Sequence, residues 1–414
     1  MSWLRITQGN RHSRLLRSIV CVLMASLAVA ACSGAAVPST GSSGPAATPS
    51  ASSSDVASSF PRPPTTSPVA TASPMPSPGS FVPTGSMSTG RNGATATLLD
   101  DGQVLIAGGS WSQGALSSAE LYDPSTGMFS PTGSMLVARD GATATSLPNG
   151  TVLIAGGADD GGATAEIYDP NSGEFKPTGP MVASRALQTA TLLKSGDVLL
   201  TGGTSLAGYL ASAEIYDPSV GKFKPTGSMR AARESHTATL LSDGRVLVVG
   251  GDRGIVAPDQ LYLADVEVYD PSTGRFSSTG PLQTPRTSAT ATLLPDGRVL
   301  VAGGFNIDRV LASAEIYDAA TTRFSPTGSL ASARQGHTAT LMANGQVLVA
   351  GGFDDLADVL SSAEVYEPAT GSFVPTGSMT DGRADHTATP LQDGRVLMAG
   401  GNAADQSTCD LYWP

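Results

Sequence analysis

The stretch that decides the fold runs from residue 334 to residue 352 as RQGHTATLMANGQVLVAGG and, after a variable loop, from residue 363 to residue 379 as AEVYEPATGSFVPTGSM. Its template recurs seven times around a diglycine, at spacings of 48, 46, 48, 53, 48 and 49 residues. Self-similarity at such a period indicates a repeat architecture, in which each unit buries its apolar faces against its neighbours. The diglycines are Gly108-Gly109, Gly156-Gly157, Gly202-Gly203, Gly250-Gly251, Gly303-Gly304, Gly351-Gly352 and Gly400-Gly401.

Each repeat predicts four short antiparallel strands. Asp-Gly or Asn-Gly, as at Asp101-Gly102 and Asn344-Gly345, joins the first two strands, and these dipeptides favour a tight hairpin because its turn needs positive φ at both central residues. Turns such as the Asp-Pro-Ser-Thr-Gly of residues 270–274 join the last two strands, with Pro setting φ and Gly accepting the left-handed conformation. The chain is therefore expected to be all-β.

The repeats resemble kelch repeats, and the resemblance covers about four-fifths of the chain. The kelch pattern places a Tyr downstream of the diglycine and a Trp several residues further on, and here Phe replaces that Trp. The resemblance implies a seven-bladed β-propeller of four-stranded antiparallel blades, as in the central domain of galactose oxidase-like proteins. The repeated tyrosines are Tyr122, Tyr168, Tyr216, Tyr269, Tyr317, Tyr366 and Tyr412, and the phenylalanines are Phe129, Phe175, Phe223, Phe276, Phe324 and Phe373.

The last repeat stops at Tyr412-Trp413-Pro414, without a fourth strand of its own. The missing piece lies at residues 79–87, GSFVPTGSM, which repeat residues 371–379. We therefore expect this N-terminal segment to supply the outer strand of the last blade and to close the ring, which removes an exposed sheet edge. The propeller is assigned to residues 79–414.

Two charged positions recur in every repeat, one before the first strand and one two residues before the repeated Tyr. Because blades pack face to face, these charges are expected to be buried and to pair within or between blades. Seven equal copies indicate architecture rather than catalysis. The basic set is Arg91, Arg139, Arg185, Arg233, Arg286, Arg334 and Arg383, and the acidic set is Glu120, Glu166, Glu214, Glu267, Glu315, Glu364 and Asp410.

The N-terminus has the features of a secretory signal. Four arginines precede an apolar run at residues 19–31, which at ~1.5 Å per residue is too short to cross a bilayer. The run ends in Ala30-Ala31-Cys32-Ser33-Gly34 and resembles the bacterial lipoprotein box. That resemblance implies cleavage after residue 31 and lipid on Cys32, whereas the alternative is an ordinary signal peptide with a chance Cys. We expect a lipid-anchored protein on the extracytoplasmic side of a bacterial cell membrane.

Residues 32–78 are rich in Ser, Ala, Thr, Pro and Gly and carry little apolar bulk, so they predict a disordered tether between the anchor and the propeller. The formal net charge of the whole chain is −11, which disfavours a nucleic-acid partner held by charge. Three cysteines exclude a disulfide-rich scaffold. Only Cys409 would remain as a free thiol, and we interpret it as a small packed residue.

Because the strands of a blade alternate in direction, the Asp-Gly turns and the Asp-Pro-Ser-Thr-Gly turns lie on one face of the propeller. The diglycine loops and the connections between blades lie on the other face. Only the second face varies between repeats, so a binding site is expected there. Aromatic and acidic side chains in its loops suit sugar rings and hydroxyls. The binding candidates are Trp111, Tyr209, Asp252, Arg253, Tyr262, Phe305, Arg309, Phe353, Asp354 and Asp355, with Asp159, Asp160, Asp259, Asp308 and Asp358 in the same loops.

His236, His337 and His386 share one slot of the repeat, on different blades, and a structural role is favoured over a metal site. The sequence lacks the signatures of a nucleophile elbow, a phosphate loop and a zinc-binding His-Glu-x-x-His helix. We therefore assign no catalytic residues, no metal and no cofactor. The expected function is a monomeric, membrane-anchored module that binds a surface protein or glycan. The alternatives are a carbohydrate-modifying enzyme on a galactose oxidase-like propeller and a structural envelope component.

Overall fold

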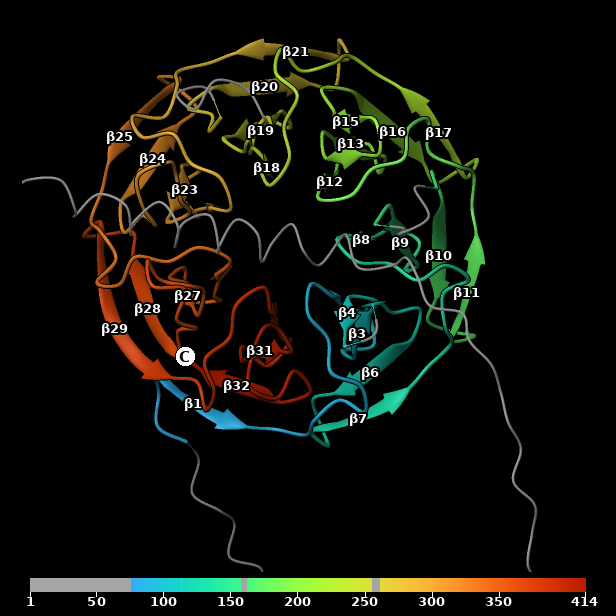
Figure 1. Ribbon diagram of the computed structural model, residues 1–414, viewed down its shortest axis with the longest axis vertical. Helices are drawn as coiled ribbons and strands as arrows, with labels where there is room; N and C mark the ends of the chain where they lie inside the picture. Colours follow the sequence, from blue (N-terminus) through green and yellow to red (C-terminus); the bar gives the residue numbers. More distant parts are fainter. Residues whose placement is uncertain (1–75, 113, 158–161, 255–260) are drawn as a thin grey trace, which may run out of the picture. The chain divides into compact units, whose positions relative to one another are not determined.

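The computed structural model describes residues 76–112, 114–157, 162–254 and 261–414. The proposed signal peptide, Cys32 and the tether up to residue 75 lie outside these residues, as do Asp159, Asp160 and Asp259. Within the described part, seven four-stranded antiparallel sheets follow one another along the chain and form the blades of a ring (Figure 1). The all-β, seven-bladed propeller expected from the repeats is confirmed.

The first four blades run from the inner strand outward in chain order. Blade 1 holds β2 (Thr95–Leu98), β3 (Val104–Ala107), β6 (Ala119–Asp123) and β7 (Met128–Pro131), and blade 2 holds β8 (Thr143–Ser146), β9 (Val152–Ala155), β10 (Ala165–Asp169) and β11 (Glu174–Pro177). Blade 3 holds β12 (Thr189–Leu192), β13 (Val198–Thr201), β16 (Ala213–Asp217) and β17 (Lys222–Pro225), and blade 4 holds β18 (Thr237–Leu240), β19 (Val246–Val249), β20 (Val266–Asp270) and β21 (Arg275–Ser278).

The remaining three blades follow the same plan. Blade 5 holds β22 (Thr290–Leu293), β23 (Val299–Ala302), β24 (Ala314–Asp318) and β25 (Arg323–Pro326), and blade 6 holds β26 (Thr338–Leu341), β27 (Val347–Ala350), β28 (Ser362–Glu367) and β29 (Ser372–Ser378). Blade 7 holds β30 (Thr387–Pro390), β31 (Val396–Ala399), β32 (Cys409–Trp413) and β1 (Ser80–Pro83). Two short hairpins lie in diglycine loops, β4 (Ser110–Trp111) with β5 (Gly114–Ala115) and β14 (Thr204–Ser205) with β15 (Gly208–Tyr209).

The ring closes through β1, as the matching sequences of the two ends predicted. This strand pairs antiparallel with β32, with Phe81 opposite Tyr412 and their ring centroids 4.9 Å apart. It also lies against β29 of blade 6, and the inner strand β30 contacts the inner strand β2 of blade 1 (Figure 1). The outer edge of β32 is thereby covered.

The apolar core lies between successive blades. The second strand of each blade, such as β23, is buried along its whole length because other blades cover both of its faces. Each repeated Tyr packs against the Phe of the neighbouring outer strand, for example Tyr317 on Phe324 at 4.9 Å. Phe thus supplies the aromatic contact that Trp provides in the kelch pattern.

All seven predicted ion pairs form, each within its own blade. Arg286 Nη2 lies 2.9 Å from Glu315 Oε1, and both side chains are almost fully buried. Arg286 Nη1 also donates to the carbonyl oxygens of Gly303, at 2.8 Å, and Ser313, at 2.9 Å. The arginine therefore ties the diglycine to the third strand, and Glu315 in turn accepts from the backbone N–H of Gln283 and Thr284.

The antiparallel order gives the ring two different faces. We call the one with the Asp-Gly and Asp-Pro-type turns the turn face, and the one with the diglycine loops and blade connections the loop face. The described residues include no helix long and apolar enough to span a membrane.

Candidate functional site

Two carboxylates stand side by side on the loop face of blade 4. Glu234 directly follows the buried Arg233, and Asp252 directly follows the diglycine Gly250-Gly251. Their backbones form a mutual pair, with Glu234 N donating to Asp252 O at 3.0 Å and Asp252 N donating to Glu234 O at 3.2 Å. Residues opposite each other in such a pair project their side chains to the same side, so the fold itself places the two acids together.

Tyr209 reaches these acids from the β14–β15 hairpin of blade 3. Its hydroxyl lies near the carboxylates of Asp252 and Glu234, and burial, together with these two negative charges, raises the pKa of Tyr209. Thr287, from blade 5, donates its hydroxyl to Asp252 Oδ2 at 3.1 Å. Gly254 packs so closely on the ring that a Cβ would lie 2.3 Å from Tyr209 Cε2, and its φ of +76° also favours glycine.

The surroundings of the pair change its proton affinity. Burial, assisted by the charge of Asp252, raises the pKa of Glu234 to about 7. Burial also raises the pKa of Asp252, against the opposing hydrogen bond from Thr287. Near neutral pH the Glu234 carboxyl is therefore partly protonated, and the pair offers both a donor and acceptors to a ligand.

An aromatic pair flanks the carboxylates. Tyr262 forms a backbone bridge with Asp252, and its ring meets Phe305 edge-on at a centroid distance of 5.3 Å. Phe305 itself bridges to Thr287. We call Tyr209, Glu234, Asp252, Tyr262 and Phe305 the tyrosine–carboxylate cluster.

Four members of this cluster, Tyr209, Asp252, Tyr262 and Phe305, are binding candidates proposed from the sequence, and the structure brings them together from three blades. Sequence reasoning missed Glu234. A signal was present, because the residue after each repeated Arg varies more than its neighbours. That slot holds Asn92, Asp140, Ala186, Glu234, Thr287, Gln335 and Ala384.

The other candidates lie elsewhere on the loop face. Arg309 and Asp355 line one groove, where Asp355 Oδ1 accepts from Val310 N at 2.6 Å. Phe353 forms bridges with Gln335 and Val359.

Three further candidates are remote from the cluster or serve their own loops. Asp354 Oδ1 accepts from the N–H groups of Leu356 and Asp358 and so holds its own loop. Arg253 Nη2 lies 3.8 Å from Asp265 Oδ2. Trp111 is half exposed in blade 1, beside Gly90 and Gln406.

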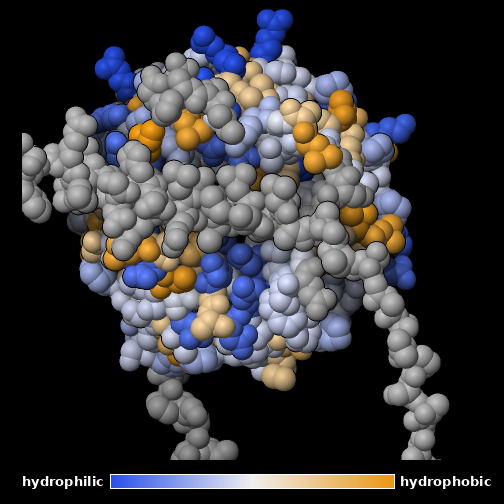
Figure 2. Space-filling view, in the orientation of Figure 1, coloured by the Kyte–Doolittle hydropathy of each residue, from blue (hydrophilic) through white to orange (hydrophobic). Residues whose placement is uncertain are grey.

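The tips of the diglycine loops expose large apolar side chains. Leu206 and Leu356 are 90% and 75% exposed, and Ile307 and Trp111 are also open to solvent. Figure 2 shows apolar groups separated by hydrophilic ones over its coloured atoms rather than one continuous apolar patch. Single exposed apolar side chains of this kind are ordinary on protein surfaces and by themselves mark no binding site.

The three histidines of the shared slot join neighbouring blades. His236 Nε2 lies 3.1 Å from Thr189 Oγ1, His337 Nε2 lies 3.0 Å from Thr290 Oγ1, and the third, His386, bonds Thr338 in the same way. Burial lowers the pKa of each to about 3, which keeps the rings neutral. These contacts agree with the packing role favoured from the sequence.

Cys409 is buried in β32, and burial raises the pKa of its thiol to about 12. It is packed as a small residue, as the repeat pattern predicted.

The comparisons with known proteins agree with this architecture. The kelch motif matches residues 235–283 and 336–380. A solved structure of a fungal alcohol oxidase of the AA5 family, in complex with copper, is 18% identical and superimposes with a TM-score of 0.67, covering 81% of this chain and 75% of its own. A comparison of the sequence with curated proteins found no match. The chain is a seven-bladed β-propeller with two segments that match the kelch motif, and it shares its fold with this oxidase.

The donor set of the described residues does not fit a copper centre. The described residues contain no group of three or more His, Cys, Asp or Glu side chains placed to hold a metal ion. The three histidines bond threonines at separate blade junctions, and the Cys409 thiol lies 3.6 Å from the carbonyl of Ser407. We derive no chemistry through copper.

Proposed function

We propose that the protein is a binding module that recognises a surface protein or glycan through its loop face, and that lipid on Cys32 anchors it to the extracytoplasmic side of a bacterial membrane. The tyrosine–carboxylate cluster is the observation that carries the recognition part. It combines aromatic rings with two carboxylates at the place where the seven repeats differ most. Aromatic rings can stack on sugar faces while carboxylates accept hydroxyl hydrogen bonds.

The asymmetry of the loop face supports this assignment. Ion pairs, Tyr–Phe contacts and turns recur around the ring, so they stabilise the fold and distinguish no ligand. Single members have counterparts in other repeats, as Phe353 corresponds to Phe305, but among the described residues the combination of Tyr209, Glu234 and Asp252 occurs at blades 3 and 4 alone. A ligand in contact with several blades would therefore meet a specific surface there.

Binding is tested by a screen of the full chain against glycan and peptide arrays. We expect at least one ligand, and we expect Tyr262→Ala to weaken its binding at least tenfold. The matched control is Met128→Ala, which removes a large exposed side chain from the turn face. Absence of any ligand, or an equal loss in both variants, would contradict loop-face recognition through the cluster.

The anchor is tested separately by metabolic labelling with palmitate in a bacterial host. The wild-type chain should incorporate label into the membrane fraction, whereas Cys32→Ser should not. Label that persists in the variant would refute lipidation at Cys32.

A second candidate function, a carbohydrate-modifying enzyme, is favoured by one observation. Glu234, with a pKa of about 7, could serve as a general acid beside an ionised Asp252. Such an activity would fall as pH rises above 7 and would be lost in Glu234→Gln. Unchanged polysaccharides after incubation with the wild-type protein at pH 6 would remove this candidate.

A further inference from the structure

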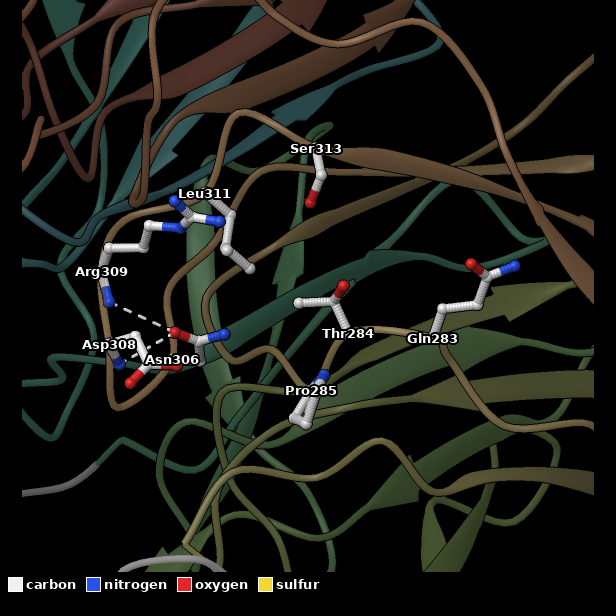
Figure 3. Close-up of a pocket in the computed structure, with 8 residues that line it drawn as sticks. All are labelled: Gln283, Thr284, Pro285, Asn306, Asp308, Arg309, Leu311 and Ser313. Carbon is white, nitrogen blue, oxygen red and sulfur yellow. Dashed lines mark hydrogen bonds between the residues drawn. The ribbon is translucent and has the colours of Figure 1, made fainter.

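An open polar groove lies on the loop face of blade 5, beside the tyrosine–carboxylate cluster. It has a volume of about 640 Å³, within the range of pockets that bind small ligands. One wall is the diglycine loop with Asn306, Asp308 and Arg309, and the other is the blade connection with Gln283 and Thr284 (Figure 3).

The connection wall is held by the buried ion pair of the blade. The N–H groups of Gln283 and Thr284 donate to Glu315 at 2.8 and 3.2 Å, and Glu315 is bound by Arg286. This wall is therefore positioned before any ligand arrives, which lowers the ordering cost of binding.

The loop wall presents hydrogen-bond donors. Asn306 Oδ1 accepts from the N–H groups of Asp308 and Arg309 at 3.0 and 3.2 Å, so its amide NH₂ is the end that faces the groove (Figure 3). Ser313 Oγ accepts from Arg286 Nη2 at 3.1 Å, which leaves its hydroxyl proton to donate elsewhere. The Asn306 amide therefore offers N–H donors to the groove, and the Ser313 hydroxyl keeps its proton to donate.

Arg309 adds the only full positive charge lining the groove. Its side chain is exposed, and among the described residues no carboxylate lies within 4.0 Å of its guanidinium. Of the nearby acids, Asp355 accepts the backbone N–H of Val310. Asp308 adds one carboxylate to the same wall, but it forms no ion pair with Arg309 within 4.0 Å. The guanidinium fork is thus left to match a planar carboxylate, which accepts two parallel hydrogen bonds.

We propose that this groove binds an acidic saccharide of the hexuronate type, with its carboxylate on Arg309 and its ring hydroxyls on Asn306, Thr284 and Gln283. This inference rests on the proposed function and names its ligand class. Polar side chains on both walls suit a hydroxylated ring, and the Arg309 guanidinium, which has no carboxylate partner among the described residues, favours a ligand that carries a carboxylate.

The test measures binding of the full chain to hexuronate oligosaccharides, to their methyl esters and to neutral hexose oligosaccharides. The wild type should bind the free acids at least tenfold more tightly than the esters, because esterification removes the charge and keeps the size. Arg309→Gln should abolish this difference, and Arg309→Lys should retain only part of it. The matched control, Arg323→Gln on the outer strand β25 of the same blade, should leave it unchanged.

The outcomes separate this inference from the proposed function. Binding of neutral sugars or peptides without preference for free acids would overturn the hexuronate assignment and leave loop-face binding intact. A preference for free acids that survives Arg309→Gln would also overturn it. No binding to any saccharide or peptide would contradict both.

Discussion

At the residue scale, the buried ion pairs stabilise each blade by satisfying many partners at once. In blade 2, Glu166 Oε1 meets Arg139 Nη2 at 2.8 Å, and Glu166 also accepts the backbone N–H groups of Leu136 and Val137. A buried ion pair offsets its desolvation cost only with such additional hydrogen bonds. The pair connects the inner end of the blade to its third strand.

Removing one charge of such a pair should strongly destabilise the fold. Glu166→Gln keeps the shape but leaves the Arg139 guanidinium buried without a counter-charge, and we expect a loss of about 3–5 kcal/mol in the free energy of unfolding. The control in the same blade is Glu174→Gln, whose exposed pair with Lys176 should change stability by less than about 0.5 kcal/mol. Urea denaturation measures both, and equal effects would contradict the structural role of the pair.

The histidine slot predicts a specific acid sensitivity. Folding lowers the pKa of His236, His337 and His386 from 6.5 to about 3, so the unfolded chain binds protons first as pH falls below 6.5. Stability should therefore decrease from pH 6.5 towards pH 3, by up to about 1.4 kcal/mol per pH unit for each histidine.

Gln188 shows how to remove this sensitivity, since it fills the same slot and donates to the carbonyl of Ala155 at 2.8 Å. Replacing all three histidines with Gln should flatten the fall in urea midpoint across this pH interval. A variant with the same pH dependence as the wild type would show that the histidines do not cause it.

At the scale of the element, contacts between blades repeat as regularly as the blades themselves. A Thr near the end of each outer strand, or directly after it, bonds the hydroxyl of the repeated Tyr in the next blade; Thr327 bonds Tyr366 in this way at 2.8 Å. The closing strand repeats this rule, because Thr84 follows β1 and bonds Tyr122 of blade 1 at 2.8 Å. Ring closure thus uses the same contacts as every other junction.

The closing strand can be tested by truncation. A chain that begins at Pro76 keeps β1, whereas one that begins at Met87 loses it and exposes the edge of β32. We expect the shorter chain to unfold at lower urea and to self-associate, because an unpaired edge invites pairing with another chain. Light scattering and urea denaturation measure these effects. Equal stability and a monomeric state for both chains would contradict the importance of closure.

Strands and loops differ in how well the sequence predicts them. The strands, the ion pairs and the partner of Phe81 follow from local signals that recur in every repeat. The tyrosine–carboxylate cluster depends on contacts across three blades, such as Tyr209 with Glu234, and no local signal encodes those contacts. Residue types in the loops therefore indicated candidates, and the variable slot after each repeated Arg could have added Glu234. The grouping of these residues into one cluster required the structure.

At the scale of the whole molecule, the turn face is nearly the same in every repeat, whereas the loop face differs from one repeat to the next. The turn face carries one short turn after another, while the loop face carries the cluster, the Arg309 groove and exposed apolar tips. Recognition of one ligand among many needs such differences. The central claim is that binding belongs to the loop face alone.

The most direct test compares matched substitutions on the two faces. Leu206, Ile307 and Leu356 are exposed on the loop face, and Met128, Val220 and Leu341 are exposed at or beside the turn face. In one variant all three loop-face residues are replaced with Ser, and in the other all three turn-face residues are. Both variants should fold, because isolated surface substitutions change stability little. Affinity for a ligand found on the arrays should fall at least tenfold in the loop-face variant and stay unchanged in the turn-face variant. The reverse result, or an equal loss in both, would contradict the claim.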